Sequence, residues 1–308
     1  MTKKDFALFA LHLSAQHAGL STQWVNYITD EAENSGVDIA DIYETKVNHL
    51  KSLIPLSADD IAVIEFMKQA KEDIQLEAEI LLRRKIDIIG RGSAYYPKNL
   101  RQKLGNIAPP ILYVIGNENL VLKRAISVVG PRNIYMRDKE YAEKIGFLCA
   151  KEKLVLVSGG ADGVDSIAQN SVLKNGGESV TYLPQGFDKS YFVKNHKKYI
   201  DDGSLLCLCA CRPDSIFTGA AALVRNKYIH SHGELSVVVR AEYKRGGSWS
   251  GAIDNISHRR TPMTVSDIPA PGNEALIQMG AGIMKYDEIN EKDFSIIKKI
   301  YSIGAFCR

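Results

Sequence analysis

From about residue 87 the sequence alternates short β-rich runs with helical runs, and this alternation constrains the fold more than any other feature. Helices are expected at residues 139–151 and 164–173, and the β-rich runs are KIDIIG, ILYVIG, AISVVG, LVLVSGG, SVTYLP and LSVVVRA. Strands rich in β-branched residues and separated by helices indicate parallel β-α-β units. We therefore expect an α/β fold with a parallel sheet, and a ligand at the carboxyl ends of its strands.

The first part of the chain has a different pattern, which predicts an all-helical domain at residues 1–86 and an α/β domain at 87–308. A long helical run follows Ser57, an expected N-cap, and places apolar residues on one stripe at Ile61, Ile64, Met67 and Ala70. The spacing of Phe6, Phe9 and Leu13 favours an amphipathic helix over a signal peptide.

Composition is that of an ordinary globular protein, with 45% hydrophobic and 24% charged residues among 308. A net charge of +3 permits nucleic-acid binding without requiring it. No apolar stretch reaches the roughly 18 residues of a membrane helix, and five cysteines without a framework spacing favour a reducing, cytoplasmic location. Cys207, Cys209 and Cys211 alternate along an expected core strand, which we favour over a metal site.

Two expected strands end in loops suited to an anion. The first runs into Gly130 and Arg132, where a glycine permits close approach and an arginine suits a phosphate. The second runs into Ser158, Gly159, Gly160 and Gly163 before a new helix, which aims backbone N–H groups at a ligand. The alternative is a pair of tight turns with no ligand.

Neither loop has the spacing of a known nucleotide-binding fingerprint. The G-x-G-x-x-G pattern is missing, no acidic residue ends the strand SVTYLP, and no Gly-Lys-Ser/Thr follows a loop. Hydride transfer and nucleotide hydrolysis are therefore disfavoured, and we expect no cofactor and no metal.

Taken together, the motifs resemble the DNA-processing protein A (DprA/Smf) family over roughly residues 87–285. They are, in chain order, ILYVIGN, AISVVGPRN, LVLVSGGADGVDSIAQ, LPQGFDKSY, LVRNKYI, GGSWSGA and NEALIQMGAGIM. The resemblance implies an extended Rossmann-like fold, no catalytic activity, and single-stranded DNA bound in a positively lined pocket. It also implies a homodimer and handover of the strand to the recombinase RecA.

Carried over by motif, the resemblance assigns the pocket to several short segments. Lys189 is expected to make a further backbone contact as a point charge. The phosphate-binding positions would be Gly130, Arg132, Ser158, Gly159, Gly160, Gly163, Arg225, Asn226, Gly247 and Ser248.

The sequence also departs from the family pattern. Asp162 stands where a basic residue is usual, and the chain ends at Arg308 without a winged-helix tail. These departures fit an alternative role as an antitoxin or regulator in a phage-defence system, opposite a toxin such as a phosphoribosyltransferase-like protein. A third alternative is an enzyme similar to nucleotide phosphoribohydrolases, although their Pro-Gly-Gly-x-Gly-Thr loop is not visible.

Other residues have two interpretations each. His230 and His232, with Glu234, are expected in a surface loop rather than at a metal. Asp162 and Asp165 are expected to cap a helix rather than act as an acid–base pair, although Asp162 in the pocket is a competing account. Trp249 either stacks on a base or packs into the core. The basic, aromatic run at 188–199 either binds a single strand or forms a solvated helix face.

Overall fold

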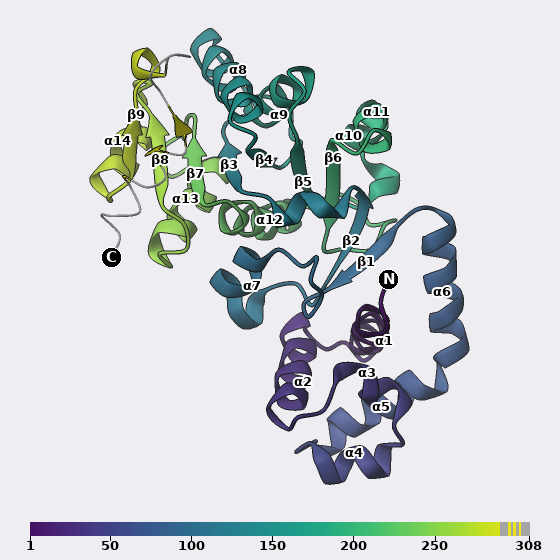
Figure 1. Cartoon of the computed structure of the whole chain (residues 1–308). Helices are drawn as coiled ribbons and strands as arrows, with labels where there is room; N and C mark the ends of the chain where they lie inside the picture. The colour runs from purple at the N-terminus through teal and green to yellow at the C-terminus, as the bar shows by residue number, and fades with distance from the viewer. Residues whose placement is uncertain (290–294, 297, 300–301, 303–308) are drawn as a thin grey trace. The chain divides into compact units, whose positions relative to one another are not determined.

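The computed structural model describes residues 1–289, 295, 296, 298, 299 and 302, which fall into two compact units (Figure 1). The first unit comprises Met1–Tyr96 and Leu104–Ile115, and the second comprises Pro97–Lys103 and Gly116–Arg308. The domain boundary predicted near residue 87 remains a prediction, and the first unit extends beyond it to include a β-hairpin. Among the described residues, no helix has the length and apolar character needed to cross a membrane.

The first unit consists of helices and the antiparallel hairpin formed by β1 and β2. Ser57 is the N-cap of α5 as predicted, because its hydroxyl accepts a hydrogen bond from the amide of Asp60. The long helical run predicted after Ser57 is divided at Ala70. The elements are α1 (Lys3–His17), α2 (Thr22–Asn34), α3 (Ile39–Glu44), α4 (Val47–Leu53), α5 (Ala58–Gln69), α6 (Lys71–Arg83), β1 (Asp87–Gly90), η1 (Gly105–Ile107) and β2 (Ile111–Gly116).

The second unit is built on a sheet in which the strands pair in the order β6-β5-β4-β3-β7-β8-β9, all parallel. The α/β fold with a parallel sheet is therefore confirmed, as are the strands predicted within this unit, except that Cys211, expected on the core strand, lies beyond β6, which ends at Cys209. The short strands β8 and β9 were not predicted. The strands are β3 (Ala125–Val129), β4 (Val155–Ser158), β5 (Ser179–Leu183), β6 (Leu205–Cys209), β7 (Leu235–Val238), β8 (Met263–Ser266) and β9 (Gly282–Met284).

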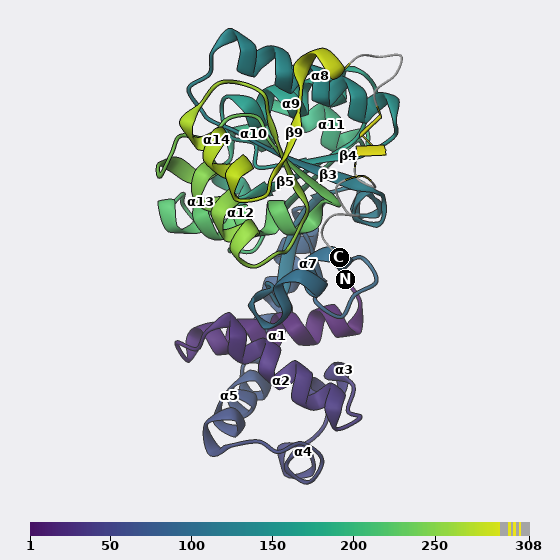
Figure 2. The same ribbon diagram turned by 90° about the vertical axis from the view of Figure 1, so that its left-hand side faces the viewer.

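Helices cover both faces of this sheet, with α8 and α9 on one face and α12 and α13 on the other (Figures 1 and 2). Strands covered on both sides are mostly apolar, which explains the nearly continuous apolar runs in the sequence. The helical elements are α7 (Lys98–Leu104), η2 (Glu118–Leu122), α8 (Met136–Lys151), α9 (Val164–Lys174), η3 (Phe187–Lys189), α10 (Tyr191–Asn195), α11 (Lys197–Asp201), α12 (Gly219–His232), α13 (Gly246–Ser257), α14 (Pro271–Gln278) and η4 (Tyr286–Glu288).

Candidate functional site

The loops that follow β3 and β4 meet at one edge of the sheet, as predicted. The two strands are parallel neighbours, so their carboxyl ends lie side by side. The amide of Val164, at the start of α9, donates to the carbonyl oxygen of Pro131 at 3.2 Å. Gly163 has a φ of +96°, and a Cβ there would lie 2.3 Å from that same oxygen. Gly163 is therefore needed for the close approach of the two loops.

The amides of the Ser-Gly-Gly loop, predicted to be free for an anion, are bound within the protein. The amide of Gly160 donates to Oε1 of Gln169 at 3.1 Å. The amides of Gly159 and Ala161 lie against the carboxylate of Asp165 and favour its charged form. Burial nevertheless raises the pKa of Asp165. An internal carboxylate thus occupies the position that we expected a ligand to take.

Arg225 of α12 is the buried cation of the site. Its Nη1 lies 3.8 Å from Oδ2 of Asp165, and the residue is only 5% exposed. Neither Nε nor Nη1 has a hydrogen-bond partner among the described residues. Burial lowers the pKa of this guanidinium, and the neighbouring charge of Arg132 lowers it further. Burial of an arginine whose N–H groups lack acceptors costs folding free energy, and an anion that accepts hydrogen bonds from those groups offsets this cost.

Two cavities adjoin at this edge of the sheet and share Arg132, Ala161, Phe217 and Arg225. The first has a volume of about 540 Å³, and four arginines face two carboxylates in its lining. The second, of about 420 Å³, extends over the glycines of the Ser-Gly-Gly loop and is lined by aromatic side chains. Besides the shared residues, the first is lined by Gly130, Asn133, Asp165, Asn226, Arg240, Glu242, Arg245, Gly246, Gly247 and Ser248, among others.

The amino-terminal end of α13 opens into the first cavity at Gly246, Gly247 and Ser248. First-turn amides have no acceptor within their own helix, so they can bind an anion. Asn226 supports this end, because its Nδ2 donates to the carbonyl oxygen of Gly247 at 3.1 Å. The helix terminus and the arginines therefore face one cavity.

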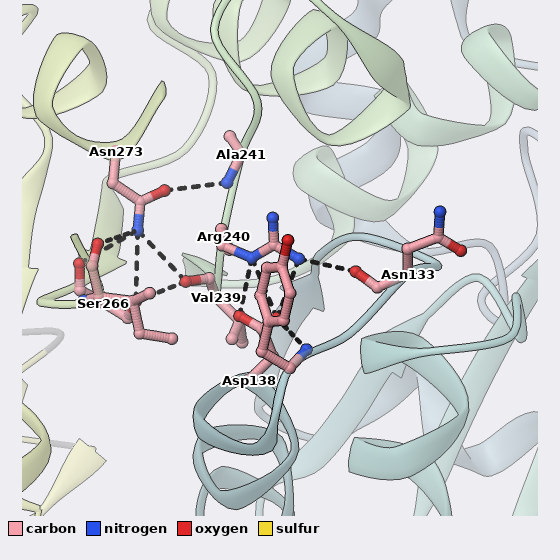
Figure 3. A network of polar contacts seen from close by, with 9 residues as sticks. Asn133, Asp138, Val239, Arg240, Ala241, Ser266 and Asn273 are labelled. Carbon is pink, nitrogen blue, oxygen red and sulfur yellow. Dashed lines mark hydrogen bonds and ion pairs between the residues drawn. The ribbon is translucent and has the colours of Figure 1, made fainter. Parts of the chain in front are cut away.

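Arg240, which follows β7, holds the loop that carries Arg132 (Figure 3). Its Nε donates to both carboxylate oxygens of Asp138 at 3.0 Å, and its Nη2 donates to the carbonyl oxygen of Asn133 at 2.6 Å. Asn273 of α14 fixes the backbone on either side of Arg240. Its Oδ1 accepts from the amide of Ala241 at 2.9 Å, and its Nδ2 donates to carbonyl oxygens that include that of Val239.

Of the predicted site residues, Gly130, Arg132, Gly159, Gly160, Arg225, Asn226, Gly247 and Ser248 line these cavities. Ser158, Gly163 and Lys189 do not. Ser158 is fully buried, and its hydroxyl donates to the carbonyl oxygen of Val128 at 2.6 Å. Lys189 is exposed in η3.

Asp162 is exposed and lines the second cavity, as the competing account predicted. The alternative in which its side chain caps α9 is wrong, because the N-cap is Gly163 and the described residues show no side-chain capping bond there. Asp165 lies in the first turn, but it turns inward to Arg225.

The expectation of a surface loop at His230 and His232 is wrong. Both are buried in the last turn of α12, where His230 Nδ1 lies 2.7 Å from Oγ of Ser236 and His232 Nδ1 lies 2.8 Å from the hydroxyl of Tyr182. Burial lowers the pKa of His230 to about 4 and that of His232 to about 3. No cluster of metal-ligating side chains occurs in the part of the chain that the structure describes.

The aromatic residues divide between core and cavity. Trp249 is buried and packs edge-on against Tyr243, with ring centroids 5.1 Å apart, so its core interpretation holds. In the run at 188–199, Tyr191 is 79% exposed and lines the second cavity. Phe217, which sequence reasoning missed, is 46% exposed and lies under the guanidinium of Arg132.

The comparisons with known proteins agree with this architecture. The family described as DNA recombination-mediator protein A matches residues 87–293. The chain belongs to this family. The resemblance seen in the sequence is thereby confirmed.

Two curated relatives match part of the chain. DprA of Streptococcus pneumoniae is 33% identical over 90 residues, which cover 29% of this chain and 32% of that protein. A putative DprA of Mycobacterium tuberculosis is 26% identical over 192 residues, covering 60% of this chain and 49% of that protein. The chain thus spans half or less of the length of these curated relatives.

Solved structures of relatives share the fold. The X-ray structure of DprA from Streptococcus pneumoniae has a TM-score of 0.73 and 22% identity, covering 96% of this chain and 99% of that one. A DprA structure from Helicobacter pylori has a TM-score of 0.57 and 23% identity, covering 72% and 97%.

Proposed function

We propose that this chain binds single-stranded DNA by its phosphates, at the edge of the sheet where the two cavities adjoin. The observation that carries the proposal is Arg225, a buried guanidinium that lines both cavities and has two nitrogens without a hydrogen-bond partner among the described residues. Arg132 and the first turn of α13 complete a set of donors suited to phosphate oxygens. Lys189 is proposed as an outer, weaker contact.

Exposed aromatic side chains support a single strand as the ligand. Tyr191 and Phe217 line the second cavity, where bases of an unpaired strand can stack on them. The Helicobacter pylori relative is described as binding single-stranded DNA in a unique mode. Since phosphate contacts and stacking carry little sequence information, we propose that binding depends only weakly on sequence.

A titration of labelled oligonucleotides tests the proposal. The logarithm of affinity for an unstructured strand should fall linearly with the logarithm of salt, by about 0.7 per phosphate contacted. Arg132→Gln should weaken binding to all sequences about equally and reduce that slope. Arg259→Gln is the matched control, because Arg259 is exposed in the same unit and lines neither cavity. Absence of binding at low salt, or equal losses in the two variants, would contradict the proposal.

The oligomeric state, the protein partner and the lack of catalysis are also proposals. We propose that the chain acts as a homodimeric binding module that delivers the strand to RecA, and not as an enzyme. Strand exchange with RecA, with and without the chain, tests the delivery. Release of free base from a nucleoside 5′-monophosphate would instead favour a phosphoribohydrolase. Growth rescue of cells that express a toxin encoded beside the chain would favour an antitoxin.

A further inference from the structure

Two cysteine side chains lie together at the end of β6. The Sγ atoms of Cys209 and Cys211 are 3.7 Å apart. Cys209 is the last residue of the strand and is only 1% exposed, whereas Cys211 lies two residues beyond and is partly exposed. Cys207 is fully buried on the same strand, and Cys149 is buried on α8.

We propose that Cys209 and Cys211 form a redox modification site, which a peroxide oxidises to an intramolecular disulfide and a dithiol reopens. Oxidation at this site does not depend on the DNA-binding function proposed above. The chemical class of the ligand is a hydroperoxide small enough to reach Cys211.

Chain geometry permits the bond. Cys211 follows Cys209 after one intervening residue, in a bend beyond the strand, so the two Cα atoms are at most roughly 7 Å apart. Disulfides join residues whose Cα atoms are about 4.4–6.8 Å apart, with sulfurs about 2.05 Å apart. The sulfurs must therefore approach each other from 3.7 Å. Cys211 lies outside the strand, so its backbone can adjust without breaking the ladder between β5 and β6.

The surroundings of the two thiols indicate which of them the peroxide oxidises first. The Cys209 thiol donates toward the carbonyl oxygen of Cys211 at 2.7 Å and lies beside the Cys211 sulfur. The contact with the Cys209 thiol lowers the pKa of Cys211, and a hydrogen bond from Ser215 acts in the same direction. Burial raises the pKa of Cys209 and that of Cys207. Since the thiolate is the nucleophile, Cys211 reacts first.

The reaction balances in two steps. The Cys211 thiolate attacks the peroxide, the O–O bond breaks, and Cys211 becomes a sulfenic acid while the other oxygen leaves as an alcohol or water after taking up a proton. The Cys209 sulfur then attacks the Cys211 sulfur, and the S–S bond forms as the S–OH bond breaks. The proton of Cys209 leaves with the hydroxide as water. The two thiols lose two electrons, which reduce the peroxide.

Thiol counting and peptide masses of the full chain test the proposal. The chain has five cysteines, and after mild treatment with hydrogen peroxide three should react with a thiol reagent in denaturant. Dithiothreitol should restore five. The tryptic peptide between Lys198 and Arg225 should lose two hydrogen atoms in mass, and fragmentation should place the link between Cys209 and Cys211.

Matched variants separate this site from the other thiols. Cys149→Ser and Cys207→Ser should keep the loss of two hydrogen atoms, whereas Cys211→Ser should abolish it. The measurement on the unsubstituted chain alone decides whether the disulfide forms, so the test stands even where a variant fails to fold. Five free thiols after peroxide treatment, a link between different cysteines or different chains, or conversion of Cys211 to a sulfinic acid instead would overturn it.

Discussion

Replacement of Arg225 by methionine is the sharpest test of the candidate site. The guanidinium is 5% exposed and lies 3.8 Å from the Asp165 carboxylate. At an effective dielectric near 20, that attraction is roughly 4 kcal/mol, before the cost of removing both charges from water. Asp165 leaves Nε and Nη1 without hydrogen bonds. A phosphate that bonds to the guanidinium would contribute about 1.5–3 kcal/mol.

The variant should therefore bind single-stranded DNA more weakly by a factor of about 10 to 100. The slope of log affinity against log salt should become shallower by about 0.7, which corresponds to one phosphate contact. Fluorescence anisotropy with a labelled oligothymidylate, measured over a series of salt concentrations, gives both quantities.

A second variant separates binding from folding. Arg225→Met alone leaves the Asp165 carboxylate buried without its counter-charge, which costs about 3–5 kcal/mol of stability. Arg225→Met combined with Asp165→Asn removes both charges and should unfold in urea close to the unsubstituted chain. If this double variant is folded and binds the strand as tightly as the unsubstituted chain, the phosphate role of Arg225 is refuted.

Three further substitutions test other parts of the second unit. Asp162→Arg should raise single-strand affinity at least about tenfold with little change in Tm, because Asp162 is exposed in the cavity lining and does not cap α9; unchanged affinity with a lower Tm would make it structural. Arg240→Met should lower the Tm by about 10 °C, since it leaves Asp138 buried and unpaired, and a calorimetric Tm within a degree or two of the original would contradict this. Burial depresses the folded-state pKa of His232 to about 3, so its contribution to stability is full above pH 6.5 and falls by roughly 1.4 kcal/mol per pH unit below it. His232→Gln should make urea stability less dependent on pH between about 6.5 and 5, and an unchanged slope would assign that dependence to other groups.

The sheet could be predicted from the sequence because a few consecutive residues are enough to identify most of its strands. Each buried strand is a short, mostly apolar run, and β3 and β4 run directly into Gly130 and Gly159, which mark their carboxyl ends. The meeting of the loops at Arg132 and Gly159 then follows from parallel topology alone. Strand β9 escaped prediction because it has only three residues, and β8 because Thr264 and Ser266 alternate with its apolar residues and leave no continuous apolar run.

The interior of the site could not be predicted, because its contacts join distant residues. Arg240 and Asp138 are 102 positions apart, and neither lies in a motif that singles it out. Asp165 was expected to favour a helix dipole, and nothing local shows that it turns toward Arg225. The histidines of α12 were misplaced because the sequence does not show that the last turn of this helix is buried against the sheet, where their partners Tyr182 and Ser236 lie on β5 and β7.

The contact between Gly159 and Arg225 has a consequence for how such chains diverge. A Cβ added to Gly159 would lie 1.1 Å from Nη1 of Arg225, so no larger residue fits while the arginine keeps this position. A substitution at position 159 should therefore depend on which residue occupies position 225. A lineage that loses the arginine removes the closest of these contacts and leaves Oδ2 of Asp165, 2.8 Å from the added Cβ, to shift, but the glycine cannot change first without displacing the arginine. In an alignment of relatives, a side chain at position 159 should therefore mark members in which the cation at 225 has already been replaced or moved.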